Sequence, residues 1–134
     1  MNVFVVGIGL IGGSFVKDLK AKMPEAIVYG IDANADHLEE ALSLGLIDVK
    51  ATYEELPLAD FVMVSIPVDV IVQELPKILD SVHEDCVVCD AGSTKELLCK
   101  VLENHPKRRN FLACHPIAGT EFSGPSSAIN GLYD

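Results

Sequence analysis

The feature that most constrains the fold of this chain is a set of glycines between two segments of different character. Gly7, Gly9 and Gly12 follow the apolar run Val3–Val6 and open a segment with a helical pattern that ends before Pro24. A strand, a turn with glycines at this spacing and a helix together are typical of a dinucleotide-binding unit. Gly7 would allow the tight turn, Gly9 would let a pyrophosphate approach the backbone, and Gly12 would let the helix pack closely on the sheet.

An acidic residue follows the second predicted strand at the spacing expected for a nucleotide site. Residues 26–31 form an apolar run that ends in Asp32, twenty positions after Gly12. A carboxylate there can accept hydrogen bonds from the ribose hydroxyls of the adenosine half, and it would repel a 2′-phosphate. Because no arginine lies near Asp32, we expect NAD rather than NADP. The alternative is a glycine-rich strand–helix corner with an exposed aspartate.

Apolar runs alternate with helical patterns along the chain, which predicts an α/β fold. We expect a Rossmann-type, doubly wound parallel sheet with helices on both faces. The length of 134 residues suits one domain, so we assign residues 1–134 to a single NAD-binding domain. Strands are predicted at 2–7, 26–31, 47–50, 60–65, 86–90 and 110–114, and helices at 10–22, 35–44, 68–80 and 94–104.

Composition excludes several classes of partner. The formal net charge of −10 disfavours nucleic acid, whose phosphates need a basic surface. Although 49% of the residues are hydrophobic, no apolar run approaches the roughly 20 residues that span a bilayer. The segment Met1–Val3 carries no basic residues of a signal peptide. We therefore expect a cytoplasmic protein with neither a membrane nor a nucleic acid as partner.

The cysteines and histidines do not predict a metal site. Cys86 and Cys89 form a CxxC within a predicted strand, where residues three apart point to opposite faces. Buried free thiols are therefore the preferred interpretation. The four histidines show no spacing with the four cysteines that suggests zinc.

Ligands of such sheets bind outside the carboxyl ends of the strands, so the residues that follow each strand are the candidates for binding. The segment Ser65–Pro67 follows the fourth predicted strand and would lie against the ribose of the cofactor. An ordinary strand-to-helix turn with a proline near the helix start is the alternative for this segment. Ten residues are thus expected to bind NAD: Gly7, Ile8, Gly9, Leu10, Ile11, Gly12, Asp32, Ser65, Ile66 and Pro67.

Two further motifs are more specific than the glycine turn. They are Asp90-Ala91-Gly92-Ser93-Thr94-Lys95 and Cys114-His115-Pro116-Ile117-Ala118-Gly119-Thr120-Glu121. With the glycine turn, they occur in the order and spacing of the prephenate dehydrogenase family, which includes arogenate-using members, and the chain resembles that family from its first strand onward. The resemblance implies NAD-dependent oxidative decarboxylation of prephenate to 4-hydroxyphenylpyruvate, or of arogenate to tyrosine, in tyrosine biosynthesis.

The resemblance also assigns roles to three residues. His115 would be the catalytic histidine, and an imidazole with a pKa near 6.5 can accept the proton of the substrate hydroxyl near neutral pH. Ser93 would hydrogen-bond that hydroxyl, although Ser93 and Glu96 also form a capping box for the helix predicted at 94–104. Glu121 would lie at the mouth of the active site and take part in gating, or it is a solvated loop carboxylate.

Members of this family continue with one more strand and a helical domain that forms a homodimer. We therefore expect the chain to be truncated before its last strand and to lack that C-terminal domain, so that it would have little or no activity alone. Two alternatives remain open. One is another NAD(P)-dependent dehydrogenase of the β-hydroxyacid dehydrogenase type, and the other is a non-catalytic nucleotide-sensing module.

Overall fold

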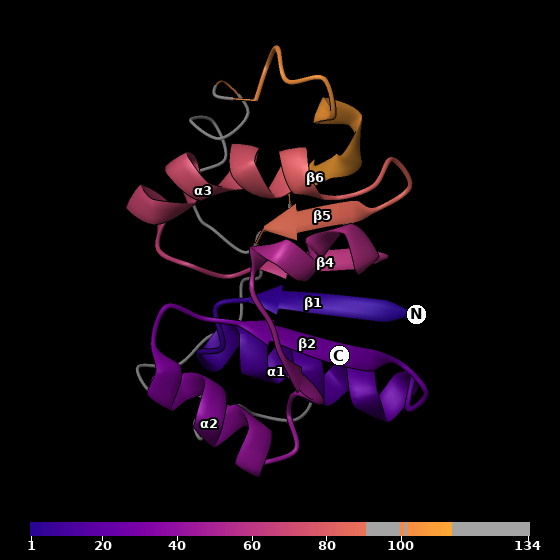
Figure 1. Cartoon of the computed structure of the whole chain (residues 1–134), viewed down its shortest axis with the longest axis vertical. Helices are drawn as coiled ribbons and strands as arrows, with labels where there is room; N and C mark the ends of the chain where they lie inside the picture. Colours follow the sequence, from indigo (N-terminus) through magenta and orange to yellow (C-terminus); the bar gives the residue numbers. More distant parts are fainter. Residues whose placement is uncertain (91–99, 101, 114–134) are drawn as a thin grey trace.

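Six parallel strands form one sheet in the order β3-β2-β1-β4-β5-β6. The computed structural model describes residues 1–90, 100 and 102–113 (Figure 1). The strands are β1 (Asn2–Val6), β2 (Ile27–Ile31), β3 (Val49–Lys50), β4 (Phe61–Val64), β5 (Val87–Asp90) and β6 (Phe111–Ala113). The helices are α1 (Leu10–Lys22), α2 (Ala35–Ser43), α3 (Val68–Ser81) and two short 3₁₀ segments, η1 (Tyr53–Leu58) and η2 (Arg108–Asn110). The predicted Rossmann-type fold is confirmed.

Helices cover both faces of the sheet. Successive side chains of β1 point to opposite faces, and the apolar side chains on each face are buried under helices. Phe4 and Val6 belong to a core cluster with the apolar face of α3 and with Leu56 of η1. Val5, between them, belongs to a second cluster with residues of α1 and α2, Val16 and Ala41 among them. These two layers explain why the strands are almost continuously apolar rather than alternating.

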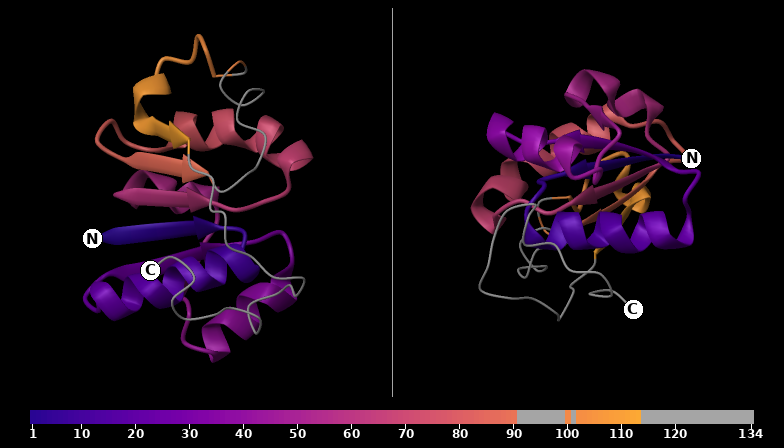
Figure 2. Two further views of the ribbon diagram at one scale, coloured as in Figure 1. Left: turned by 180° about the vertical axis from the view of Figure 1, so that it is seen from behind. Right: turned by 90° about the horizontal axis from the view of Figure 1, so that it is seen from below.

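The order of the strands creates a switch point beside β1. The chain moves outward from β1 to β2 and β3, then crosses back to β4 and continues outward to β6. Because the strands are parallel, their carboxyl ends share one edge of the sheet, as the views from behind and from below allow the reader to follow (Figure 2). Connections leave β1 and β4 in opposite directions there, which leaves a crevice for a ligand.

The boundaries of the predicted elements that the structure describes agree with the observed ones within two residues, with two omissions, the short 3₁₀ segments η1 and η2. The segment η1 was not predicted, although Thr52 and Glu55 form a capping box at its start. Asn34, which follows β2, caps α2 by accepting hydrogen bonds from the N–H groups of residues 36 and 37, and Gly45 follows this helix with a φ of 74°. The helix predicted over 94–104 lies mostly outside the described residues.

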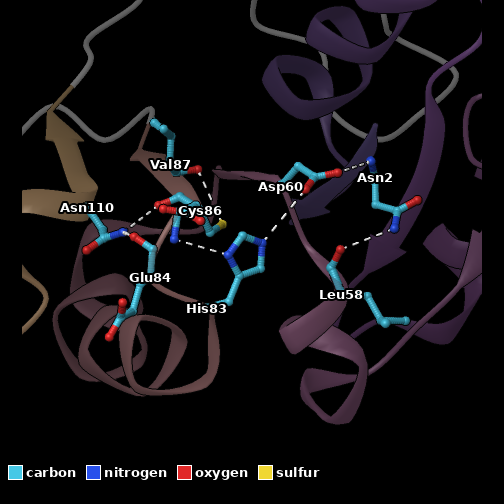
Figure 3. A network of polar contacts seen from close by, with 9 residues as sticks. Asn2, Leu58, Asp60, His83, Glu84, Cys86, Val87 and Asn110 are labelled. Atoms are coloured by element: carbon cyan, nitrogen blue, oxygen red, sulfur yellow. Dashed lines mark hydrogen bonds and ion pairs between the residues drawn. The ribbon is translucent and has the colours of Figure 1, made fainter.

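A polar network closes the opposite edge of the sheet, where the strands begin (Figure 3). The Asp60 carboxylate accepts a hydrogen bond from the N–H of Asn2 at 2.8 Å and lies 3.7 Å from Nε2 of His83. The side-chain amide of Asn110 donates to the carbonyl of Cys86 at 2.8 Å. These bonds satisfy backbone groups at the amino ends of β1 and β5, so the residues at this edge stabilise the fold.

Both thiols of the CxxC are free and buried, as predicted. Burial raises the pKa of the Cys86 thiol to about 11, and the nearby Asp60 carboxylate acts in the same direction. Among the described residues, no group of three or more histidine, cysteine, aspartate or glutamate side chains is arranged to hold a metal ion. No helix within the described part of the chain is both long and apolar enough to cross a membrane.

Candidate nucleotide-binding site

The glycine turn is held against the end of β4 by two residues that leave no room for a side chain. Gly7 has a φ of 94°, and a Cβ there would lie 2.4 Å from the carbonyl oxygen of Ser65. A Cβ on Gly12 would lie 2.2 Å from the carbonyl oxygen of Gly7. The Ser65 hydroxyl donates a hydrogen bond of 2.7 Å to that same carbonyl. The turn is therefore locked between β1, α1 and β4.

Gly9 differs from the other two glycines because its surroundings are open. Apart from Gly9 itself and its neighbours in the chain, no atom of the described residues lies within 4 Å of the position that a Cβ on Gly9 would take. Gly9 is the N-cap of α1, and in the described part of the chain neither a side-chain cap nor an acidic residue serves the first turn of this helix. Its unpaired N–H groups and the positive end of its dipole favour an anion such as a phosphate.

Asp32 lies next to the glycine turn at the end of β2, and it already makes backbone contacts. Its Oδ2 accepts a hydrogen bond from the N–H of Ile8 at 2.8 Å, and its Oδ1 accepts one from the N–H of Asn34 at 2.8 Å. Nδ1 of His37 lies 3.5 Å from Oδ2. A carboxylate offers about four acceptor positions, so acceptor capacity remains for a ribose hydroxyl. The Asp32 carboxylate thus holds the glycine turn in place through the N–H of Ile8, and it also lines the groove where a ligand would bind.

A groove of about 290 Å³ runs along these residues at the carboxyl edge of the sheet. Seven of the ten residues predicted to bind the cofactor line it: Gly7, Ile8, Gly9, Asp32, Ser65, Ile66 and Pro67. Ala33, His37 and Val70 line it too and were not predicted. Gly12 packs beneath the turn. Leu10 and Ile11 are the first two residues of α1, which follows the turn. The expected cofactor residues therefore lie together around one groove.

A second hollow of about 240 Å³ adjoins this groove and shares Asp32, Ala33, Ile66 and Val70 with it. Its walls include the apolar side chains of Val6 and Ile31. Tyr53 of η1 and Glu74 of α3 also line it. A hollow with apolar walls beside a groove at the N-terminus of α1 suits a flat ring attached to a sugar and a phosphate.

Tyr53 and Glu74 form a hydrogen-bonded pair at this hollow. The Tyr53 hydroxyl donates to Oε1 of Glu74 at 3.1 Å, and Nζ of Lys77 donates to Oε2 at 2.9 Å. The bond from Lys77 has the largest effect and lowers the pKa of Glu74, burial acts in the opposite direction, and the bond from Tyr53 lowers the pKa further. Burial raises the pKa of Tyr53, and the Glu74 carboxylate raises it further. At neutral pH the pair is a carboxylate and a protonated phenol.

The sequence did not predict Tyr53, Glu74 or His37 as site residues. A capping box at Thr52 and Glu55 is the signal that would have placed Tyr53 at the start of a helical turn after β3. Nothing in the local pattern shows that Glu74, 21 positions further on, meets Tyr53. That contact depends on how α3 packs on the sheet.

The three predicted catalytic residues, Ser93, His115 and Glu121, lie outside the described residues. The strands that precede two of them are described. β5 ends at Asp90 and β6 ends at Ala113, and these two residues are paired in register. Both strands therefore deliver the chain to the same edge as the groove.

Residues 15–134 match the nucleotide-binding domain of prephenate dehydrogenase. The chain belongs to the prephenate dehydrogenase family. The matched range begins after Gly12, so the family match and the geometry of the glycine turn support the assignment separately. This membership agrees with the resemblance drawn from the sequence motifs, and not with the β-hydroxyacid dehydrogenase alternative.

Curated and solved relatives agree with the family match. The chain is 30% identical over 137 residues to prephenate dehydrogenase from Bacillus subtilis, with 99% of this chain and 37% of that protein covered. Prephenate dehydrogenase from Aquifex aeolicus superimposes with a TM-score of 0.86 and 35% identity, over 98% of this chain and 48% of that one. A structure of the A. aeolicus enzyme with hydroxyphenyl propionate and NAD+ superimposes with a TM-score of 0.82 and 34% identity, over 100% and 48% of the two chains. The chain spans less than half the length of these relatives.

Proposed function

We propose that this chain is the cofactor-binding part of an NAD-dependent dehydrogenase that oxidatively decarboxylates prephenate or arogenate. The observation that carries the proposal is the open space over Gly9, which is the N-cap of α1 and lines the same groove as Asp32. A pyrophosphate fits there because the backbone is accessible and the helix end favours an anion. The structure of a relative with NAD+ bound, which superimposes on the whole chain, supports the choice of cofactor.

The same geometry suggests how the cofactor lies. The pyrophosphate would contact the turn at Gly9, the adenosine ribose would donate to Asp32, and the adenine would enter the apolar hollow beside Val70. The nicotinamide half would then extend from the turn toward the ends of β4 and β5, past Ser65. When bound, NAD would accept a hydride from the ring of the substrate.

Ser93 and His115 would perform the proton chemistry in this proposal. In the sequence they follow Asp90 and Ala113 within three residues, and those two strand ends are paired in register at the carboxyl edge of the sheet. His115 would accept the proton of the substrate hydroxyl as the ring carbon loses its hydride, and Ser93 would hydrogen-bond that hydroxyl. Loss of carbon dioxide then makes the ring aromatic. Glu121 would gate access of the substrate.

The family resemblance further suggests a homodimer of the complete protein, and we also propose a place in the cytoplasm.

Steady-state assays of the full-length protein test this function most directly. We expect NAD to be reduced in the presence of prephenate or arogenate, with release of carbon dioxide in equal amount. The two substrates, assayed separately, also determine which of them is preferred. Absence of NAD reduction with both substrates, in a protein that binds NAD, would refute the proposed activity while leaving the nucleotide site intact.

A further inference from the structure

We propose that Tyr53 and Glu74 select adenine over purines with an oxygen at position 6 by accepting the hydrogen bonds of its 6-amino group. This proposal rests on the NAD site proposed above and assigns a specificity role to two residues outside the glycine turn. A pocket that is only apolar would hold any flat base of similar size. A hydrogen-bonding pair in its lining adds a means of distinguishing bases.

The position of the hollow relative to Asp32 is the first support. A ribose held by Asp32 carries its base on the side away from the pyrophosphate, and the hollow that adjoins Asp32 on the side of Val6 and Ile31 is lined by Tyr53 and Glu74. Apart from Asp32, these two residues are the ones with polar side chains among those that line the hollow. A base stacked between the apolar walls would therefore turn its polar edge toward them.

The direction of the hydrogen bonds is the second support. The Tyr53 proton is donated to Oε1 of Glu74, so the Tyr53 oxygen offers only lone pairs to a ligand. Oε2 of Glu74 accepts from Lys77, and a carboxylate oxygen has a further acceptor position. The pair thus presents acceptors. Adenine offers two N–H donors on its 6-amino group. Hypoxanthine has an oxygen at that position, which only accepts, and one N–H donor beside it at N1, so one of the two acceptors of the pair would face the oxygen and be repelled.

The protonation states agree with this assignment. The lowered pKa of Glu74 keeps the carboxylate ionised, and the raised pKa of Tyr53 keeps its hydroxyl protonated and donating to Glu74. The Glu74 side chain is 25% exposed, so it is shielded enough for a mismatched acceptor to be costly and still open to a ligand.

Calorimetric titration of the chain with NAD and with nicotinamide hypoxanthine dinucleotide, which carries a 6-oxo group, tests the proposal. We expect NAD to bind about tenfold or more tightly than the hypoxanthine analogue, since a hydrogen bond to a charged group has about this effect. Glu74→Gln should weaken NAD and strengthen the analogue, because the amide N–H can donate to the 6-oxo oxygen. Glu25→Gln, the same change at an exposed position before β2, should leave both affinities as in the unchanged chain.

The results that would overturn the proposal differ in whether they also refute the proposed NAD site. Equal binding of the two dinucleotides by the unchanged chain, or equal weakening of both by Glu74→Gln, removes the specificity role and leaves the NAD site standing. Failure of both dinucleotides to bind refutes the nucleotide site and this role together. If Glu74→Gln does not fold, Tyr53→Phe serves instead. It should reduce the preference for NAD several-fold, and an unchanged preference would count against the pair.

Discussion

At the scale of single residues, the three glycines of the turn serve different purposes. Gly7 and Gly12 are required by the protein itself, because a Cβ on either would collide with backbone oxygens of Ser65 or Gly7. Gly9 meets no such obstacle from the described residues. The sequence pattern assigned Gly9 to the approach of a ligand, and the space above it is what that assignment requires.

Alanine substitutions separate these two requirements. Gly9→Ala should change the free energy of unfolding by less than about 1 kcal/mol, because its extended backbone and open surroundings accept a methyl group. It should nevertheless weaken NAD binding by about tenfold or more, since the methyl group fills the space proposed for the pyrophosphate. Gly12→Ala should lose on the order of 1–3 kcal/mol of stability through overpacking. Urea denaturation and calorimetry measure both quantities, and unchanged NAD affinity in Gly9→Ala would contradict the proposed binding mode.

The proposed role of His115 gives a kinetic prediction for the full-length protein. His115→Asn should lower turnover by roughly two to four orders of magnitude and leave the affinity for NAD nearly unchanged, because general-base catalysis contributes about this factor. Ser93→Ala should lower turnover by less. Steady-state kinetics and calorimetry together provide the measurement. A His115→Asn protein with near-normal turnover would remove His115 from the proposed chemistry.

At the scale of elements, the beginning of α2 connects stability to the site. Asn34 caps α2, and its own N–H donates to Asp32. Asn34→Ala should cost about 1 kcal/mol of stability, as the loss of an N-cap usually does. Asp36→Ala is the matched control, because Asp36 lies in the first turn of α2 and is not its N-cap, and it should cost less. Urea denaturation of both variants checks the order, and a larger loss for Asp36→Ala would contradict the assignment.

The longer elements were predictable from sequence because their apolar period is sustained over a whole segment. The strands β1, β2, β4 and β5 are short apolar runs, and α1 and α3 have helical patterns of 13 and 14 residues. The six-residue η1 was missed because it is too short for periodicity and contains Pro57, which usually breaks a helix. The site residue Tyr53 was missed with it.

At the scale of the whole molecule, the predicted site depends on topology rather than on any one motif. Gly7–Gly12, Asp32 and Ser65–Pro67 are separated in sequence, yet the parallel sheet places the ends of β1, β2 and β4 side by side. The rule that ligands bind at the carboxyl edge was enough to predict this gathering. It could not predict that Asp32 bonds the N–H of Ile8, because that contact depends on the exact path of the turn.

The most direct test of the nucleotide site is a calorimetric comparison of NAD and NADP binding to this chain and to Asp32→Ser. We expect NAD to bind more tightly than NADP, because the Asp32 carboxylate accepts from the ribose hydroxyls and repels a 2′-phosphate. Asp32→Ser should narrow this difference by on the order of 1–3 kcal/mol. Asp85→Ser, at an exposed position near the opposite edge of the sheet, should leave it unchanged. Tighter binding of NADP to the unchanged chain, or a preference that survives Asp32→Ser in full, would contradict the account.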